Sequence, residues 1–263
     1  MSDCIIDTTT DGVMLIRFNR PERMNAMGGT LVAELREALE AGKADDRVRA
    51  FVVTGEGRGW CAGADLAAMG SGAAPANPRS QGLDPLGDAG RTILALHNCD
   101  KPTIAAVNGV AVGGGFGLCT GFDIRIASDQ ARFGTIFIKR ALSPDFGLSW
   151  YLPRLVGPER AADLFYSGRL VDAQEALALG IVSKVVPHAS LLEEAMAQAT
   201  LYAKQPPTAI TATRRALKNS IGATLEGHLE FEWGHQKQRL ASAEFQEGVK
   251  AFLEKREPNY ARF

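Results

Sequence analysis

The chain has 263 residues, 46% of them hydrophobic, which is enough to fill a sizeable core in one large domain or two small ones. Its 29 basic and 30 acidic residues give a formal net charge of -1. A nearly neutral chain lacks the electrostatic footprint of a protein that binds nucleic acid or an anionic membrane surface. We therefore expect neither nucleic acid nor a membrane among its partners.

The spacing of the cysteines and the N-terminal residues indicate the cellular compartment of the protein. Cys4, Cys61, Cys99 and Cys119 show no CxxC spacing, and residues 1–20 lack the basic, apolar and small-residue regions of a signal peptide. No apolar stretch reaches the roughly 18 uncharged residues that a membrane-spanning helix needs. We expect a cytoplasmic protein.

Short apolar strands alternate with helical segments in the first part of the chain. In chain order, the sequence predicts a strand over Val13 to Arg20, a helix over Thr30 to Asp45, and strands over Arg49 to Gly55 and Thr103 to Val112. The strands are rich in β-branched residues and end in turn formers, whereas the helix carries apolar residues at helical spacing. Such alternation is typical of an α/β fold.

Two further segments complete the organisation. Residues 70–90 hold small residues, Pro and Gly with few large apolar side chains, which predicts a loop. From Pro206 onward the strand signals stop, and residues 212–220 and 229–256 read as successive helices. We expect a core over residues 1–205 that holds the site, and a C-terminal helical region over residues 206–263.

Three consecutive glycines, Gly113 to Gly115, follow the predicted strand that ends at Val112. A glycine-rich turn that opens a helix exposes unpaired backbone N–H groups and favours an anion or a developing oxyanion. No GxGxxG or GK[ST] pattern fits here, so a nucleotide phosphate is excluded. Two alternatives stay open: an oxyanion site, or glycines that let a helix pack closely on a strand.

A second glycine-containing turn, Gly55 to Leu66, also follows an apolar strand. Its Ala62-Gly63-Ala64 step leaves backbone N–H groups unobstructed by side chains. One N–H group from each turn, converging on a thioester carbonyl, would form an oxyanion hole that stabilises an enolate.

The chain resembles the enoyl-CoA hydratase/isomerase family, the crotonases, in six ordered motifs that cover nearly its whole length. They are NRPERMNAM, GRGWCAGADL, KPTIAAVNGVAVGGGFGL, DIRIAS, LPRLVG and VKAFLEKREP. The resemblance implies a crotonase fold, a spiral of β-β-α turns with a C-terminal helical trimerisation region. It also implies an acyl-CoA ligand, a homotrimer or dimer of trimers, and no cofactor beyond the coenzyme A of the substrate.

The resemblance assigns residues to the site. The backbone N–H groups of Ala64 and Gly114 match the two oxyanion donors of the family. Matching positions for binding coenzyme A are Arg23, Ala26, Ala62, Asp65 and Leu66, together with Phe252 and Lys255, which in the family reach the ligand of a neighbouring subunit. The expected lining of the acyl pocket is Phe116, Gly117, Phe137 and Trp150.

The acid pattern departs from that of a hydratase. Hydratases of the family carry one glutamate two residues after the glycine triplet and another twenty residues later, where this chain has Gly117 and Phe137. Neither residue can activate water or protonate a carbon. We therefore do not expect hydratase activity.

The acid that remains for the pocket is Asp145, whose neighbours in the sequence are mostly apolar, so we expect its pKa to be raised. The alternative is that Asp145 caps a helix after Ser143-Pro144. The resemblance favours the first reading, because dienoyl-CoA isomerases and ring-1,2-epoxyphenylacetyl-CoA isomerases carry an aspartate here, and the latter also lack both glutamates. We expect an isomerase that uses Asp145, Ala64 and Gly114.

Other activities stay open at this point. A 4-chlorobenzoyl-CoA dehalogenase of the family uses its aspartate here as a nucleophile with a histidine base, for which the chain offers His97. A hydratase-type lyase, an acyl-CoA hydrolase and a binder without turnover are the further alternatives. Outside the site, Asp123 is expected to pair with a scaffold arginine, and the four histidines show no metal-ligand spacing.

Overall fold

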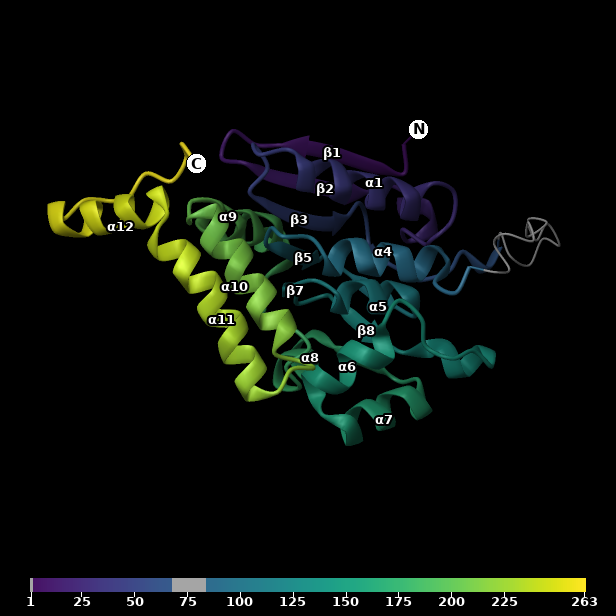
Figure 1. The fold of residues 1–263 in the computed structure, drawn as a ribbon. Coiled ribbons are helices and arrows are strands. Elements are labelled where there is room, and N and C mark those ends of the chain that lie inside the picture. Colours follow the sequence, from purple (N-terminus) through teal and green to yellow (C-terminus); the bar gives the residue numbers. More distant parts are fainter. Residues whose placement is uncertain (1, 68–83) are drawn as a thin grey trace.

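The computed structural model describes residues 2–67 and 84–263, and its strands form two sheets. The larger sheet has the order β1-β2-β3-β5-β7-β10, with β1 antiparallel to β2 and every other neighbouring pair parallel (Figure 1). Its strands are β1 (Cys4–Thr8), β2 (Val13–Phe18), β3 (Ala50–Gly55), β5 (Thr103–Val107), β7 (Ile124–Ser128) and β10 (Lys184–Val186).

The smaller sheet has the order β4-β6-β8-β9, with β9 antiparallel to β8. Its strands are β4 (Gly59–Cys61), β6 (Val110–Val112), β8 (Arg132–Gly134) and β9 (Leu170–Asp172). From β3 to β8, consecutive strands alternate between the sheets. Helices α4 (Gly87–His97) and α5 (Gly114–Thr120) follow β4 and β6. The fold is therefore the expected α/β spiral of β-β-α turns.

Helices cover both faces of the larger sheet, which explains why its central strands β3 and β5 are buried at every residue. On one face, α1 (Leu31–Ala44) buries Leu31, Leu35 and Leu39, which are spaced four apart. On the other face, α9 (Leu191–Ala203) buries Ala195 and Ala199 against the sheet. Small residues at four-residue spacing let α9 lie close to the strands.

Further helices precede the C-terminal region. They are η1 (Pro21–Arg23), η2 (Ile136–Arg140), α6 (Leu148–Val156), α7 (Pro158–Ser167), α8 (Ala173–Ala178) and η3 (His188–Ser190). Over residues 2–67 and 84–263, no helix combines the length and the apolar character that crossing a membrane requires.

The strands predicted near Val13 and Arg49 and the helix predicted from Thr30 are confirmed. The segment from Thr103 to Val112, however, is two strands in different sheets. The chain turns at Asn108, whose side chain accepts a hydrogen bond from Gly55 N at 3.1 Å and donates one to Gly57 O at 2.9 Å. The predicted single strand is therefore wrong.

Two predictions of turn or loop segments also need correction. The turn predicted over residues 55–66 contains strand β4, because that segment pairs with β6 in the smaller sheet. Most of the loop predicted over residues 70–90 lies outside the described residues, and its last part, from Gly87, already forms the first turn of α4.

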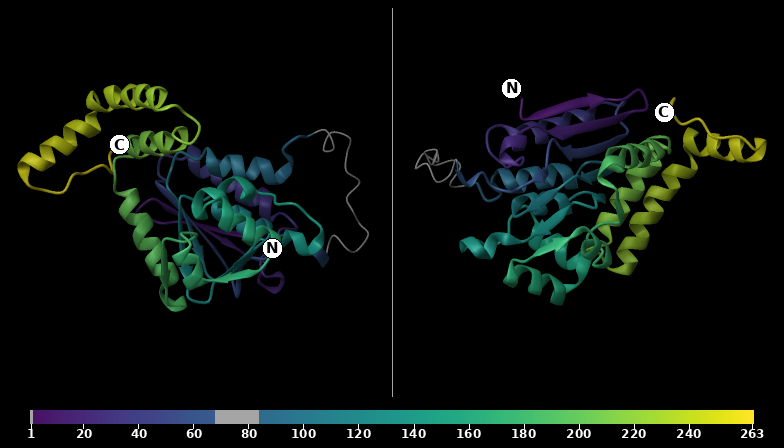
Figure 2. Two further views of the ribbon diagram at one scale, coloured as in Figure 1. Left: turned by 90° about the horizontal axis from the view of Figure 1, so that it is seen from below. Right: turned by 180° about the vertical axis from the view of Figure 1, so that it is seen from behind.

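The C-terminal part consists of three helices, α10 (Pro207–Asn219), α11 (Leu225–Leu240) and α12 (Ala243–Glu254), as expected. Figure 2 shows that α11 and α12 extend away from the sheets. Helix α10 is anchored by Arg214, whose Nε lies 2.7 Å from Oδ2 of Asp123 and whose other nitrogens donate to the carbonyls of Leu96 and His97. The predicted pairing of Asp123 with a scaffold arginine is thus confirmed. The division at residue 205 stays a prediction.

Candidate active site

The two glycine-containing turns lie side by side at one edge of the smaller sheet. Strands β4 and β6 are parallel neighbours, so the segments that follow them leave the sheet at the same edge. A Cβ atom built on Gly63 would lie 3.3 Å from Gly114 N, so the turns are in contact.

The N–H groups of Ala64 and Gly114 are available at this edge. Gly63 O accepts a hydrogen bond from Met27 N, and Asp65 N donates to Met27 O, which leaves the N–H group of Ala64 between them. Gly114 is the first residue of α5, so its N–H group precedes the first intrahelical bond. In the described part of the chain neither group donates to a protein acceptor. Together they form a candidate oxyanion hole.

The three glycines have separate structural roles, and the close-packing reading of the triplet applies to Gly115. Gly113 has a φ of 56°, in the left-handed region that favours glycine. A Cβ atom on Gly115 would collide with the Cys61 carbonyl, so this glycine permits close packing of α5 on β4. Only Gly113 and Gly114 line the pocket that opens at the turns.

Asp145 lies in the turn that connects η2 to α6. Its carbonyl accepts a hydrogen bond from Leu148 N at 3.0 Å, and the next two residues, Phe146 and Gly147, have positive φ values of 47° and 69°. Gly147 is the N-cap residue of α6, and no side chain caps that helix. The alternative in which Asp145 serves as a helix cap is therefore wrong.

The Asp145 carboxylate faces the glycine turn. Its Oδ1 atom lies 3.3 Å from the position of a Cβ atom built on Gly114. Burial among the atoms of the pocket raises the pKa of the Asp145 carboxyl above its ordinary value, because desolvation penalises the charged form. Among the described residues no basic side chain contributes to the pKa of this carboxyl to oppose the shift.

The pocket has a volume of about 370 Å³. Six of the residues expected at the site line it: Ala62, Ala64, Leu66, Gly114, Phe137 and Asp145. The lining also contains residues that sequence reasoning missed, among them Met27, Asp88, Arg140 and Phe146. Met27 is the last residue of the motif NRPERMNAM, and Phe146 follows Asp145. Their position next to recognised site residues could have predicted that both line the pocket.

Three residues expected in the acyl pocket lie elsewhere. Phe116 is fully buried in the core against Phe133, because two residues along a helix turn its side chain to the face opposite Gly114. Gly117 is buried beneath the backbone of Asp145 and Phe146. Trp150 packs against His97 and Tyr151 instead of lining the pocket.

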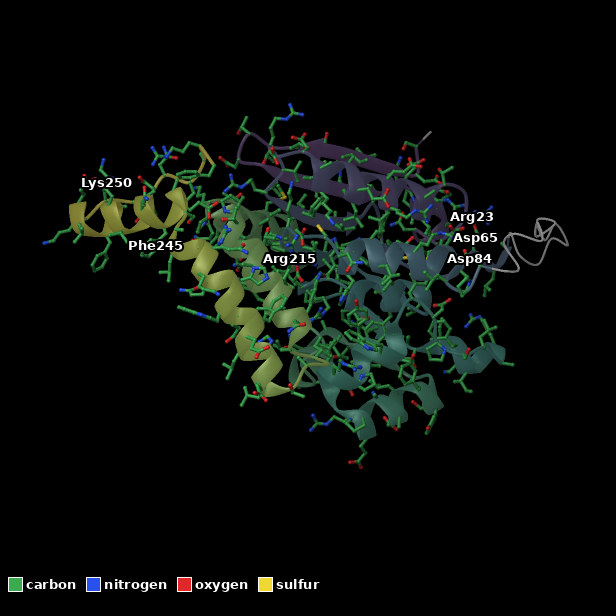
Figure 3. All side chains as sticks on the ribbon, viewed as in Figure 1. Arg23, Asp65, Asp84, Arg215, Phe245 and Lys250 are labelled. Carbon is green, nitrogen blue, oxygen red and sulfur yellow. The ribbon has the colours of Figure 1, made fainter. Side chains whose placement is uncertain are left out.

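The residues expected to hold coenzyme A fall into two groups. Figure 3 shows Arg23 and Asp65 at one end of the molecule, where Arg23 is exposed on η1 and Ala26 is buried nearby. Asp65 is buried and forms an ion pair with Arg20 at 3.0 Å, so it also supports the turn that carries Ala64. The binding roles of these residues stay predictions.

Phe252 and Lys255 belong to α12 and its C-cap, at the opposite end of the molecule. Figure 3 shows this separation through Phe245 and Lys250 of the same helix. Phe252 is 81% exposed in the single chain. One chain does not bring these residues to its own pocket, and their predicted contact with a neighbouring subunit's ligand remains a prediction.

The histidines are engaged away from the pocket. His97 Nδ1 lies 2.9 Å from the Tyr151 hydroxyl, and burial lowers the pKa of this histidine. His188 Nδ1 lies 3.1 Å from Ser128 Oγ, and His228 Nε2 lies 3.2 Å from a Glu232 oxygen. Within residues 2–67 and 84–263, no group of three acidic, histidine or cysteine side chains is arranged to hold a metal ion.

The spiral fold, the paired glycine turns and the pocket carboxylate are those of an acyl-CoA enzyme, and comparison with known proteins agrees. A family model described as enoyl-CoA hydratase/isomerase matches residues 8–262, so the chain belongs to this family. It is 36% identical to 1,2-epoxyphenylacetyl-CoA isomerase of Escherichia coli, over 99% of both chains. It is 35% identical to a probable enoyl-CoA hydratase of Rhodobacter capsulatus, over 95% of both.

Solved structures agree with the fold. A probable enoyl-CoA hydratase/isomerase from Mycobacterium abscessus superimposes with a TM-score of 0.88 at 35% identity, over 98% of both chains. An enoyl-CoA hydratase from Bacillus anthracis superimposes with a TM-score of 0.90 at 32% identity, over 99% of both. The relatives carry hydratase and isomerase names alike, so the choice between these activities depends on the acids of the site.

Proposed function

We propose that this enzyme isomerises an unsaturated acyl-CoA thioester by moving one proton with a single carboxylate. The observation that carries the proposal is the position of Asp145, whose Oδ1 faces Gly114 while Gly117 and Phe137 occupy the positions of the two hydratase glutamates. A pocket with one free base and an oxyanion hole suits proton transfer within one substrate.

The reaction balances without water or a second substrate. The thioester carbonyl oxygen accepts hydrogen bonds from the N–H groups of Ala64 and Gly114. The Asp145 carboxylate removes an allylic proton, and the electron pair of the broken C–H bond moves into the conjugated system to give a dienolate. The same carboxyl then returns the proton to another carbon of that system, so the product has the composition of the substrate.

The electrostatics of the pocket support Asp145 as the base. Its raised pKa makes the carboxylate a stronger base than an ordinary aspartate. The other acid among the described residues that line the pocket, Asp88, accepts hydrogen bonds from Arg91 at 2.9 Å and Arg36 at 3.2 Å, and these bonds lower its pKa. Asp88 is therefore the poorer base.

The alternatives receive less support. The histidine base of a dehalogenase would be His97, which contacts Tyr151 and is not part of the pocket lining. Hydration requires an acid and a base around one water molecule, and the glutamate positions supply neither. A binder without turnover would share the oxyanion hole and is separated from the isomerase only by experiment.

The deciding experiment incubates the protein with a panel of unsaturated acyl-CoA thioesters and follows absorbance and mass. Isomerisation changes absorbance at constant mass, hydration adds one water, and hydrolysis or dehalogenation alters mass in other ways. The same panel in D₂O reports proton exchange at the α and γ carbons. A panel that shows neither a new isomer nor exchange would remove the isomerase proposal.

The proposal also includes the role of coenzyme A, the oligomeric state and the cellular location of the enzyme. Coenzyme A enters only as part of the substrate, and the chain assembles as a trimer or a dimer of trimers through its C-terminal helices. All four cysteines are buried free thiols, which supports a cytoplasmic location.

A further inference from the structure

Gly117 lies directly under the turn that carries Asp145. The glycine is buried in α5, and a Cβ atom built on it would lie 2.7 Å from Phe146 Cβ and 2.9 Å from Asp145 O. The first atom is rigidly attached to the backbone and the second belongs to it. A side chain at position 117 therefore requires a movement of the turn and not only a change of rotamer.

The turn contacts one face of α5 at two glycines. Gly114 and Gly117 are three residues apart, which places them on the same face of the helix. A Cβ atom on Gly114 would lie 3.1 Å from Phe146 Cδ2 and 3.3 Å from Asp145 Oδ1. The absence of side chains at both positions creates the flat surface on which the turn packs.

The conformation of the turn depends on these contacts. Phe146 has a φ of 47°, an unfavourable value for a bulky residue, and such strain persists only where neighbouring structure enforces it. Phe146 is nevertheless buried, with 8% of its surface exposed, and its Cβ is the atom nearest to a Cβ built on Gly117, followed by Asp145 O and Phe146 O. Packing on α5 is thus the contact that can hold this strained turn.

We infer that Gly117 is a positioning residue: its missing side chain allows the strained Asp145-Phe146 turn to pack on α5 and hold the Asp145 carboxylate beside Gly114. This inference rests on the proposed function for what the carboxylate does there. It also implies that a glutamate at position 117 of this chain would displace the turn that carries Asp145. Gly117 is then required to position Asp145, and it does more than mark the absence of a hydratase glutamate.

The first test compares Gly117→Ala with Gly121→Ala. Gly121 is the buried C-cap of the same helix, and a Cβ atom there would meet the side-chain ends of Leu96 and Ile93 at 3.0 and 3.2 Å, away from Asp145. We expect Gly117→Ala to slow deuterium exchange into the acyl-CoA by about 10²-fold, the effect of a small displacement of a catalytic group. Acyl-CoA affinity should change little, and Gly121→Ala should keep the wild-type exchange rate. Wild-type exchange in Gly117→Ala would overturn the inference.

The second test introduces the hydratase acid itself. We expect Gly117→Glu to lose proton exchange without gaining hydration of crotonyl-CoA, because the glutamate displaces the turn instead of sharing the pocket with Asp145. A variant that hydrates crotonyl-CoA while keeping wild-type exchange would show that the two acids are compatible, and the inference would be wrong.

A measurement independent of turnover separates this inference from the proposed function. Carboxyl ¹³C titration, with Asp145 assigned by its absence in Asp145→Asn, reports whether the group remains in its desolvated position. We expect its pKa to fall toward the ordinary value in Gly117→Ala and to stay raised in Gly121→Ala. If wild type shows no exchange, the proposed function fails while this titration still decides the positioning role.

A rescue variant keeps the test decisive in the case that Gly117→Ala folds poorly for the reason that the inference gives. Phe146→Gly removes the Cβ atom nearest to position 117 and the strain of the positive φ. The loss of thermal stability caused by Gly117→Ala should then be smaller in the Phe146→Gly background than in wild type, a comparison that cancels the cost of removing the buried Phe146 side chain. An equal loss in both backgrounds would place the steric conflict elsewhere and overturn the inference.

Discussion

Oδ1 of Asp145 lies 3.3 Å from the position that a Cβ atom would take at Gly114, the residue whose backbone N–H group opens α5. The proposed catalytic acid and the proposed oxyanion donor therefore meet across a glycine. Any side chain at position 114 would fill the space between them. The arrangement leads to predictions about the acid, its titration, the missing glutamates and the surrounding scaffold.

Replacing Asp145 by Asn should abolish proton exchange while acyl-CoA binding is kept. The substitution preserves size and leaves the oxyanion donors in place, so we expect a loss of about 10²–10⁴-fold, the usual contribution of a general acid or base. Deuterium wash-in from D₂O measures it. The matched control is Asp172→Asn, since Asp172 caps α8 through a 2.9 Å hydrogen bond from Glu175 N and Asn also caps well. Unchanged exchange in Asp145→Asn would exclude Asp145 from the mechanism.

The exchange rate should rise with pH through the raised pKa of Asp145, because only the ionised carboxylate accepts the proton. The contribution of Asp145 to the free energy of unfolding should fall as the pH rises. A folded-state pKa above the unfolded one gives stability that is present below the unfolded pKa and is lost as pH rises through the folded pKa. Asp145→Asn should therefore unfold at a slightly higher temperature than wild type at neutral pH and show no such gain at acidic pH. Thermal scans at both pH values provide the check, and an equal difference at the two would contradict it.

Hydration of crotonyl-CoA should be slow. Each missing glutamate removes a general acid or base worth about 10²–10⁴-fold, so turnover should fall several powers of ten below that of a relative with both glutamates. Loss of absorbance together with a gain of one water in mass gives the rate. Turnover comparable to that of such a relative, under the same conditions, would count against the acid assignment.

The apolar surface of α12 should be buried in an oligomer. Phe252 and Leu253 are 81% and 73% exposed in the single chain, far more than an isolated helical end normally shows. We expect sedimentation to give a trimer or its dimer, and Leu253→Asp to dissociate it. Lys255→Ala should weaken acyl-CoA binding, whereas Lys250→Ala on the same helix should not. A monomer with full acyl-CoA affinity would contradict both expectations.

The contact between α10 and the core should depend on Arg214. Its side chain is 7% exposed and pairs with Asp123 at 2.7 Å, while Asp123 also accepts from Thr103 N at 2.9 Å. Arg214→Met should lower the free energy of unfolding by about 2–4 kcal/mol, because it leaves a partly buried carboxylate without its cation. Arg215→Met, which removes an exposed pair with Asp100, should cost about 0–1 kcal/mol. Denaturant unfolding compares the two, and equal losses would refute the role of Arg214.

The sequence by itself determined the class of the protein and the acids available to it. The order of residues along the chain directly gives the six motifs and the two glycine turns. It also shows that positions 117 and 137 are not glutamate and that position 145 is Asp. The strand periodicity near Val13 and Arg49 and the apolar stripe of α1 were equally local, and the structure confirms them. Such signals are readable because side chains a few residues apart share a face of one element.

Only the tertiary structure decided how these elements meet. It divided the segment from Thr103 to Val112 between two sheets, turned Phe116 into the core, and placed Gly117 under Phe146. Each outcome depends on contacts between segments far apart in the sequence, such as Asn108 with the backbone of Gly55. The rotation of a short helix and the path of a strained turn follow from the packing of those neighbouring segments. Neither feature can be predicted from a periodic pattern in the sequence.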